Sequence, residues 1–266
     1  MILALSHWWG GVLALGSFLF YFAAVIAHRR MAPDMLRLTL FAAWVLHGLM
    51  LAEGLLGNPP RFGFAPALSM TMWLVLAVYA VQSRLFPQLK SHWALAGLGG
   101  AAVILAVIFP GSSYLKVASI WLPLHWALGI ASYGLFAAAV VHGGMMQRSE
   151  RAMREATQSD AGLPLLTLER LTFRFVEAGF VLLSATLLVG WLFGEQLYGD
   201  GLSWKWNHKT IFSVLAWVVF AGLLMGRARL GWRGLKAVRV MYVGCGLLLL
   251  GYVGSRFVLE VMLGRS

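Results

Sequence analysis

Two histidines lie inside or beside long apolar runs, where an imidazole is costly to bury without a partner. His47 lies within the run 44–51 (WVLHGLML), and His125 directly follows residues 121–124 (WLPL). A neutral imidazole is satisfied either by a hydrogen bond to a neighbouring helix or by coordinating a metal ion through one ring nitrogen. The sequence leaves both alternatives open for each histidine, and His125 also stands where an ordinary interfacial histidine is common.

A cation in the last apolar run, Arg256, is similarly expensive to bury. Glu260 follows at i+4 and would neutralise it within one helix. The alternative partner is a carboxylate of a ligand, because a guanidinium offers a fixed fork for two parallel hydrogen bonds. Both alternatives stay open.

A short polar segment before the seventh apolar run combines two indoles, a histidine and two lysines. The segment reads Trp204-Lys205-Trp206-Asn207-His208-Lys209-Thr210. A flat cofactor with acidic edges would suit it, since indoles stack on aromatic faces and lysines bind carboxylates. An aromatic belt with flanking lysines at the membrane interface explains the same composition almost as well.

The composition indicates that membrane helices position these residues. Of the 266 residues, 60% are hydrophobic and 12% are charged, whereas a soluble domain has about 25% charged residues. The formal net charge is +11, but the basic residues are dispersed among apolar runs, so the excess indicates membrane orientation and no nucleic-acid binding. The single cysteine, Cys245, excludes an intramolecular disulfide, a CxxC centre, a cysteine-rich zinc site and covalent cofactor attachment through CxxCH.

Eight runs are long and apolar enough to cross a bilayer as helices, at about 20 residues per crossing. Most of the 21 lysines and arginines fall in alternate loops, which predicts that those loops are cytoplasmic and that both termini lie outside. The N-terminus lacks the basic start of a cleavable signal, so the first helix is expected to stay. We predict an all-α integral membrane protein with a single bundle of about eight transmembrane helices. The runs are 3–27, 37–57, 66–84, 92–110, 121–146, 173–194, 210–226 and 239–262.

We predict one domain over residues 1–266, because no internal repeat or low-complexity tract interrupts the chain. The only long polar stretch is 147–172. Its Glu150 and Arg154, spaced i, i+4, predict a short cytoplasmic helix, and residues 163–166 (LPLL) predict a turn after it.

Several of these motifs resemble the cytochrome c assembly superfamily of haem-handling membrane proteins, most closely its CcsA-like branch, which includes the YpjD and HemX proteins. The resemblance covers most of the chain and is strongest over residues 121–266. Residues 125–133 (HWALGIASY) are similar to the His-x6-Ser-Tyr helix start of the family. Further similarity lies in residues 164–170 (PLLTLER), Trp217, residues 231–234 (GWRG) and residues 251–256.

The resemblance implies a non-covalent, b-type haem on the outer face of the membrane, with an axial histidine at the position of His125. His47 matches a histidine in the second span of YpjD-like relatives and is the candidate for the other axial ligand of the haem iron. His208 is the substitute second ligand. Two imidazoles leave the iron no open coordination site, which favours binding, carriage or electron transfer over oxygen chemistry.

The same resemblance implies roles for the residues around such a haem. Trp204 and Trp206 would belong to the tryptophan-rich segment that covers it. Arg256 and Lys209 would bind its propionates.

The sequence departs from the cytochrome c synthases of the family at several positions. Their signature runs Trp-x-Trp-Asp-x-Lys-Glu, whereas Asn207 and Thr210 replace the two acids here. Met225 stands where those proteins have a transmembrane histidine, and Leu263 stands near their second outer histidine. We therefore expect no catalytic residues and no synthase activity.

The resemblance implies a haem-binding protein of a bacterial-type inner membrane that handles haem at the outer face in cytochrome c biogenesis. Its expected partners are haem, the lipid bilayer and other proteins of cytochrome c maturation or haem biosynthesis. One alternative is a HemX-like regulatory or scaffold protein without bound haem, in which the histidines are structural. A transporter of a small solute or metal is a weaker alternative, since no inverted repeat or pair of broken helices is evident.

Overall fold

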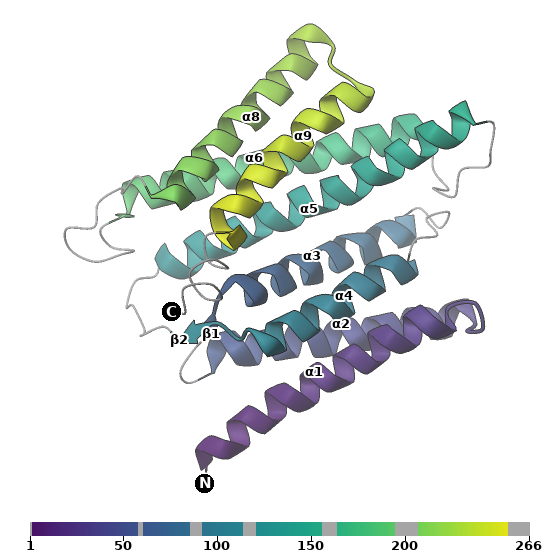
Figure 1. Cartoon of the computed structure of the whole chain (residues 1–266), viewed down its shortest axis with the longest axis vertical. Helices are drawn as coiled ribbons and strands as arrows, with labels where there is room; N and C mark the ends of the chain where they lie inside the picture. Colours follow the sequence, from purple (N-terminus) through teal and green to yellow (C-terminus); the bar gives the residue numbers. More distant parts are fainter. Residues whose placement is uncertain are drawn as a thin grey trace. The chain divides into compact units, whose positions relative to one another are not determined.

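The predicted apolar runs form helices, because a helix satisfies its own backbone hydrogen bonds where lipid offers none. The structure is a computed structural model of the chain, and it describes residues 2–57, 61–85, 92–113, 121–155, 164–194 and 207–254. Within these residues the α-helices are α1 (Ile2–Ala27), α2 (Pro33–Leu56), α3 (Phe64–Leu85), α4 (His92–Ile108), α5 (Trp121–Arg154), α6 (Leu165–Leu192), α8 (His208–Leu230) and α9 (Gly234–Leu249) (Figure 1). A π-helix, η1 (Leu250–Gly254), continues α9, and the strands are β1 (Arg61–Phe62) and β2 (Ser112–Ser113).

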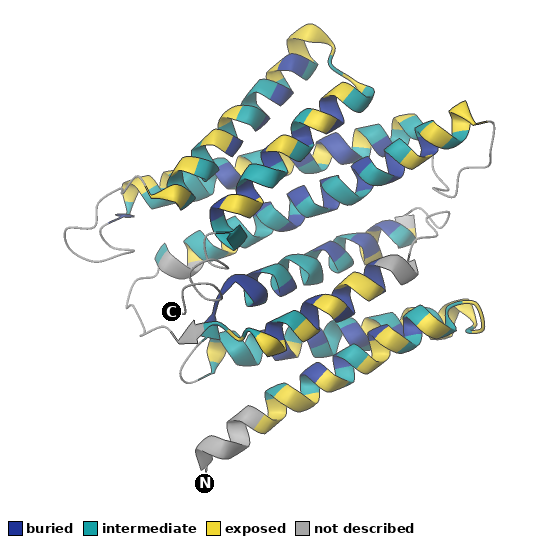
Figure 2. Ribbon diagram, in the orientation of Figure 1, coloured by how far each residue is buried: buried dark blue, intermediate teal, exposed yellow. Residues whose placement is uncertain are grey.

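Seven of the described helices are long and apolar enough to cross a membrane, and α4 is a shorter apolar helix of 17 residues. Many large apolar side chains along the helices are exposed, among them Leu15, Phe41 and Val218 (Figure 2). Such exposure is unusual in a soluble protein, whereas lipid accepts it. The chain is therefore an all-α membrane protein, as predicted. The outer location of both termini stays a prediction.

The helices group into two compact units. The first unit contains α1 to α4 with β1 and β2, and the second contains α5, α6, α8, α9 and η1. Each unit has its own buried side chains, described separately below. The prediction of one domain over residues 1–266 stays a prediction.

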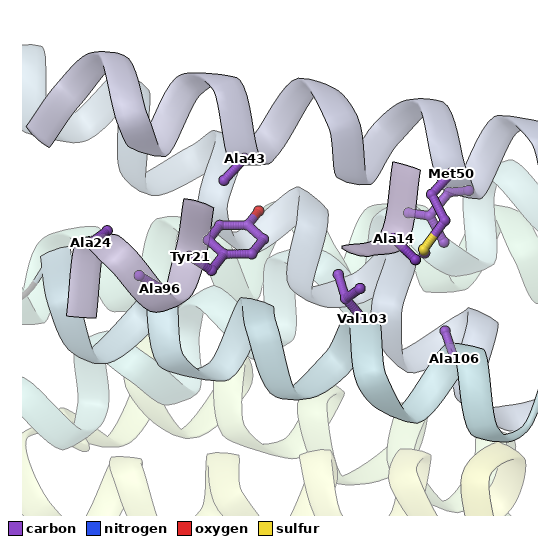
Figure 3. Close-up of a cluster of buried hydrophobic side chains, with 9 residues drawn as sticks. Ala14, Tyr21, Ala24, Ala43, Met50, Ala96, Val103 and Ala106 are labelled. Carbon is purple, nitrogen blue, oxygen red and sulfur yellow. The ribbon is translucent and has the colours of Figure 1, made fainter. Parts of the chain in front are cut away.

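Small side chains form much of the core of the first unit. Figure 3 shows Tyr21 of α1 among Ala24, Ala43 and Ala96, which come from α1, α2 and α4. These three alanines are fully buried, and Tyr21 is only 1% exposed. Alanine lets helix backbones approach closely, which is how membrane helices gain packing energy without a hydrophobic driving force between them.

Two tryptophans tie α2 to α3 by a reciprocal pair of hydrogen bonds. The indole N–H of Trp44 donates to the carbonyl oxygen of Trp73 at 3.0 Å, and the indole N–H of Trp73 donates to the carbonyl oxygen of Trp44 at 2.9 Å. The two rings stack with centroids 4.6 Å apart and planes at 6°. Gly48, one turn after Trp44, makes room for this pair, because a Cβ there would lie 2.9 Å from the Trp73 indole nitrogen.

The two short strands of the first unit pair with each other, although α3 and α4 lie between them in the sequence. They pair antiparallel, with Arg61 opposite Ser113 and Phe62 opposite Ser112. Gly111 precedes β2 with φ of 78°, and a Cβ there would lie 2.5 Å from the carbonyl of Phe62. Glycine is therefore required at this close approach.

Two stacked phenylalanines lie in the core of the second unit. Phe136 of α5 and Phe220 of α8 lie with ring centroids 4.0 Å apart and planes at 9°, and both are buried. Gly179 of α6 faces Phe136, and Gly244 of α9 faces Phe220. Two glycines thus let α6 and α9 approach the ring stack that joins α5 to α8.

Helix α5 is longer than the predicted run 121–146, because it continues to Arg154. No proline or glycine follows Met146 within the helix, and the predicted Glu150–Arg154 ion pair is present at 2.7 Å. The first residues of the stretch expected as a separate cytoplasmic helix therefore belong to α5. Helix α6 begins at Leu165, after Pro164, so it also takes up the end of that stretch.

A tight corner joins α8 to α9. Gly231 ends α8 with φ of 63°, and the backbone N–H of Trp232 donates to the carbonyl of Gly226 at 3.1 Å, which is a glycine-based helix stop. Arg227 reaches α6 with an ion pair to Glu169 at 3.0 Å and lies 3.5 Å from the centroid of the Phe173 ring. Arg227 also donates to the carbonyl oxygen of Trp232 at 3.4 Å, so it links Glu169 of the segment 164–170 to Trp232 of the segment 231–234.

The glycines of α9 provide a matched test of this packing. Gly244→Ala is expected to lower the free energy of unfolding by about 1–3 kcal/mol, because its Cβ would overlap the buried Phe220 ring at 2.7 Å. Gly246→Ala has nothing within 4 Å of its Cβ and is expected to raise stability by up to about 1 kcal/mol through helix propensity. Thermal unfolding in detergent, followed by circular dichroism, measures both changes. Equal shifts in the two variants would contradict the described α8–α9 packing.

Candidate functional site

His47 is fully buried in the first unit, with hydrogen-bond partners on two neighbouring helices. Its Nε2 lies 2.7 Å from the hydroxyl oxygen of Ser69 on α3, and its Nδ1 lies 3.3 Å from the hydroxyl oxygen of Tyr21 on α1. The Tyr21 and His47 rings also meet edge to face, with centroids 5.9 Å apart. Both ring nitrogens of His47 are therefore engaged within the protein.

This arrangement resembles the structural alternative for His47 set out from the sequence. In a membrane interior, a three-helix network that satisfies every ring nitrogen fixes the relative rotation of α1, α2 and α3. Coordination of a metal through either nitrogen would require one of the two hydrogen bonds to be given up. The prediction that His47 is an axial ligand is not tested by these contacts and stays a prediction.

His125 has a different environment at the start of α5 in the second unit. Its Nδ1 is buried and has no hydrogen-bond partner among the described residues. The ring interacts with the backbone of Thr186 on α6, and the charge of Lys209 acts on it from α8. A buried ring nitrogen that has no hydrogen-bond partner costs about 1–3 kcal/mol.

The His-x6-Ser-Tyr segment holds this part of α5 against two other helices. Ser132 lies two turns after His125 and donates its hydroxyl hydrogen to the carbonyl of Gly179 on α6, at 3.1 Å. Tyr133 donates to the carbonyl of Leu248 near the end of α9, at 3.3 Å. Ser132 and Tyr133 thus fix the position and rotation of the helix that presents His125.

Lys209 and Tyr252 meet at the same end of the second unit. The Lys209 ammonium lies 5.1 Å from the centroid of the Tyr252 ring, which is within cation–π range. The Tyr252 ring lies 6.3 Å from that of Tyr133. Lys209 comes from the first turn of α8, Tyr252 from η1 and Tyr133 from α5, so these contacts connect the three elements.

Asn207 and Thr210, the two positions that differ from the synthase signature, cap α8. The side-chain oxygen of Asn207 accepts hydrogen bonds from the backbone N–H of Thr210 at 3.0 Å and from its hydroxyl at 3.1 Å. Asparagine at this position is a strong helix start. The cap sets the point at which α8 begins, and it therefore sets where His208 and Lys209 stand. His208 is exposed at this helix start.

His142, on the same helix as His125, has a similarly incomplete set of partners. It is 2% exposed; its Nδ1 lies 2.8 Å from the carbonyl oxygen of Ala138, and its Nε2 has no partner among the described residues. The nearest ring is Phe175 of α6, with centroids 5.3 Å apart. No cation interacts with His142 in the described contacts, which distinguishes it from His125.

Several predicted site residues lie outside the described part of the chain. These are Trp204, Trp206 and Arg256. Of the predicted residues that are described, His125, His208 and Lys209 belong to the second unit, and His47 belongs to the first. Sequence reasoning missed Tyr252 as part of this group. Its neighbour Gly251 was the available signal, because a glycine inside an apolar run often marks a close approach of two backbones.

Comparison with known proteins places these features in a family. The cytochrome c assembly protein family matches residues 32–263. An uncharacterized 28.8 kDa protein of Azospirillum brasilense is 32% identical over 209 residues, which is 74% of this chain and 76% of that protein.

Two further relatives are named for a function or for a cellular location. The cytochrome c biogenesis protein CcsA of Thermosynechococcus vestitus is 24% identical over 236 residues, 80% of this chain and 72% of that protein. The inner membrane protein YpjD of Escherichia coli K12 is 35% identical over 99 residues, 37% of this chain and 36% of that protein. The family match covers residues 32–263, which is most of this chain, so the chain belongs to the cytochrome c assembly protein family.

Proposed function

We propose that this membrane protein binds haem through His125 at the outer face of a bacterial-type inner membrane and handles it for cytochrome c assembly. The observation that carries the proposal is the buried Nδ1 of His125, which has no hydrogen-bond partner among the described residues. Membership of the cytochrome c assembly family supports it, as does the similarity to a protein named for cytochrome c biogenesis. The outer face follows from the predicted orientation with both termini outside.

The residues around His125 fit the chemical groups of a haem. An axial nitrogen, a cation for the propionates and aromatic side chains for the ring are the protein groups that a non-covalent b-type haem needs. His125 would supply the nitrogen and Lys209 the cation. Trp121, one turn before His125, stacks on Phe193 with centroids 3.8 Å apart and extends the aromatic surface at this end of the unit.

For the second axial ligand we propose His208, the substitute already considered from the sequence. His208 adjoins Lys209, whose charge acts on the His125 ring, so the same unit would supply both imidazoles. His47 instead has both ring nitrogens hydrogen-bonded inside the first unit. In this proposal His47 has a structural role, and Trp204, Trp206 and Arg256 complete the haem-binding set.

The proposed role is binding and transfer of haem, without a catalytic residue of the chain. A haem held by His125 and His208 would supply reversible one-electron chemistry. Asn207 and Thr210 support a role other than synthesis, because both replace acids of the synthase signature and both are engaged in capping α8. The proposed partners are haem, the bilayer and other proteins of cytochrome c maturation or haem biosynthesis.

The imidazole of His125 is expected to determine the spin state of the bound haem. The protein purified in mild detergent from haem-replete cells is expected to show a low-spin haem spectrum with sharp reduced α and β bands, near one haem per chain. His125→Ala is expected to give a high-spin or empty protein, because it removes one axial nitrogen. His142→Ala is the matched control, since it also removes a buried imidazole of α5 and is expected to keep the low-spin spectrum.

Optical absorption of the oxidised and dithionite-reduced proteins decides this prediction. A wild-type protein without a haem band, even after haem is added, would refute the haem proposal and favour the HemX-like regulatory role. An unchanged spectrum in His125→Ala would remove His125 as the ligand.

Single substitutions distinguish His208 from His47 as the second haem ligand. His208→Ala is expected to lose the low-spin spectrum, whereas His47→Ala is expected to retain it and to unfold at a lower temperature. Ser69→Ala is the control for the structural effect, because it leaves Nε2 of His47 without its partner and touches no proposed ligand. A buried group left unsatisfied costs about 1–3 kcal/mol. Loss of the low-spin spectrum in His47→Ala, but not in Ser69→Ala, would restore His47 as the ligand.

A further inference from the structure

The π-helix at the end of α9 brings a tyrosine to the lysine at the start of α8. A π-helical turn is wider than an α-helical turn, is rare, and is frequently found at functional sites. Gly251 lies within η1, and a Cβ there would be 2.9 Å from the Cβ of Phe212 and 3.6 Å from the carbonyl oxygen of Lys209. Glycine at this position therefore allows η1 to lie directly against the first turn of α8.

The next residue, Tyr252, is held in place from the other side by α5. Its ring lies 6.3 Å from the Tyr133 ring, at an interplanar angle of 51°. Tyr133 in turn donates to the carbonyl of Leu248, within α9 and just before η1 begins. The Tyr252 ring is thus supported by the same segment of α5 that presents His125.

The Tyr252 ring faces the Lys209 ammonium, at 5.1 Å from the ring centroid. A lysine side chain loses about 1.5–2 kcal/mol of rotamer freedom when it is fixed in one place. An aromatic face attracts the ammonium through its quadrupole and so orders the lysine side chain. A lysine ordered in advance binds an anion more tightly than one that must be ordered on binding.

We propose that Tyr252 is a positioning residue that holds the Lys209 ammonium over its ring, ready for a carboxylate of the ligand that His125 binds. The inference rests on the proposed haem function and deepens it, since it assigns the recognition of the carboxylate edge to a lysine–tyrosine pair. The ring of Tyr252 carries this role, and its hydroxyl does not. The effect is therefore specific to ligands that have a free carboxylate.

The test compares two probes that differ only in their carboxylates, ferric protoporphyrin IX and its dimethyl ester, titrated into the haem-depleted full-length protein in detergent. Tyr252→Leu is expected to weaken binding of the free acid about two- to thirtyfold, which is the range of a cation–π contact, and to leave binding of the ester unchanged. Lys209→Met is expected to have the same selective effect. Tyr252→Phe keeps the ring and is expected to restore the wild-type ratio of the two affinities.

Tyr242→Leu is the matched control, because it removes a tyrosine of α9 whose hydroxyl lies near Gly143, away from Lys209. It is expected to bind both probes as the wild type does. Equal weakening of acid and ester binding in Tyr252→Leu would overturn the inference, because the tyrosine would then be purely structural. Unchanged or tighter binding of the acid in this variant would overturn it as well. A wild-type protein that binds neither probe would overturn the haem proposal and this inference together, whereas the other outcomes leave the haem proposal standing.

Discussion

Inside a membrane, a polar side chain must find its partner within the protein, because lipid offers none. This constraint explains the contrast between the histidines. His47 is satisfied by hydroxyls from two other helices, so it contributes to helix packing. His125, in contrast, keeps one buried ring nitrogen without a partner among the described residues. Both ring nitrogens of the buried histidine are therefore hydrogen-bonded in the first unit, whereas one ring nitrogen of His125 is not in the second.

In the second unit, helices that follow later in the sequence all contact α5. Ser132 bonds α6, Tyr133 bonds α9, and Phe136 stacks on α8. Each of these residues lies on the two turns that follow His125 or just beyond them. Within the segment 125–133, the serine and the tyrosine thus hold in place the helix that carries the histidine.

Most of the fold follows from apolar length, and less of the site follows from the sequence. Helix positions were predictable because about 20 apolar residues have one stable form in lipid. The extension of α5 to Arg154 was not, since composition changes at Met146 while the helix does not end. Lys209 was identified by its neighbours in sequence, but Tyr252 was missed, because its contact depends on the π-helical end of α9. The hydrogen bonds of His47 to Ser69 and Tyr21 could not be predicted from the sequence, because they depend on how α1, α2 and α3 are rotated relative to one another.

The reciprocal tryptophan pair has a mechanical consequence for the first unit. Each indole of the pair bonds the backbone of the opposite helix, and the two bonds run in opposite directions. A slide of α2 along α3 by one residue, about 1.5 Å, would break both bonds at once. The two helices therefore resist shear as a single stiff element, and any strain from a thicker or thinner bilayer has to be absorbed at the other helix contacts of the unit.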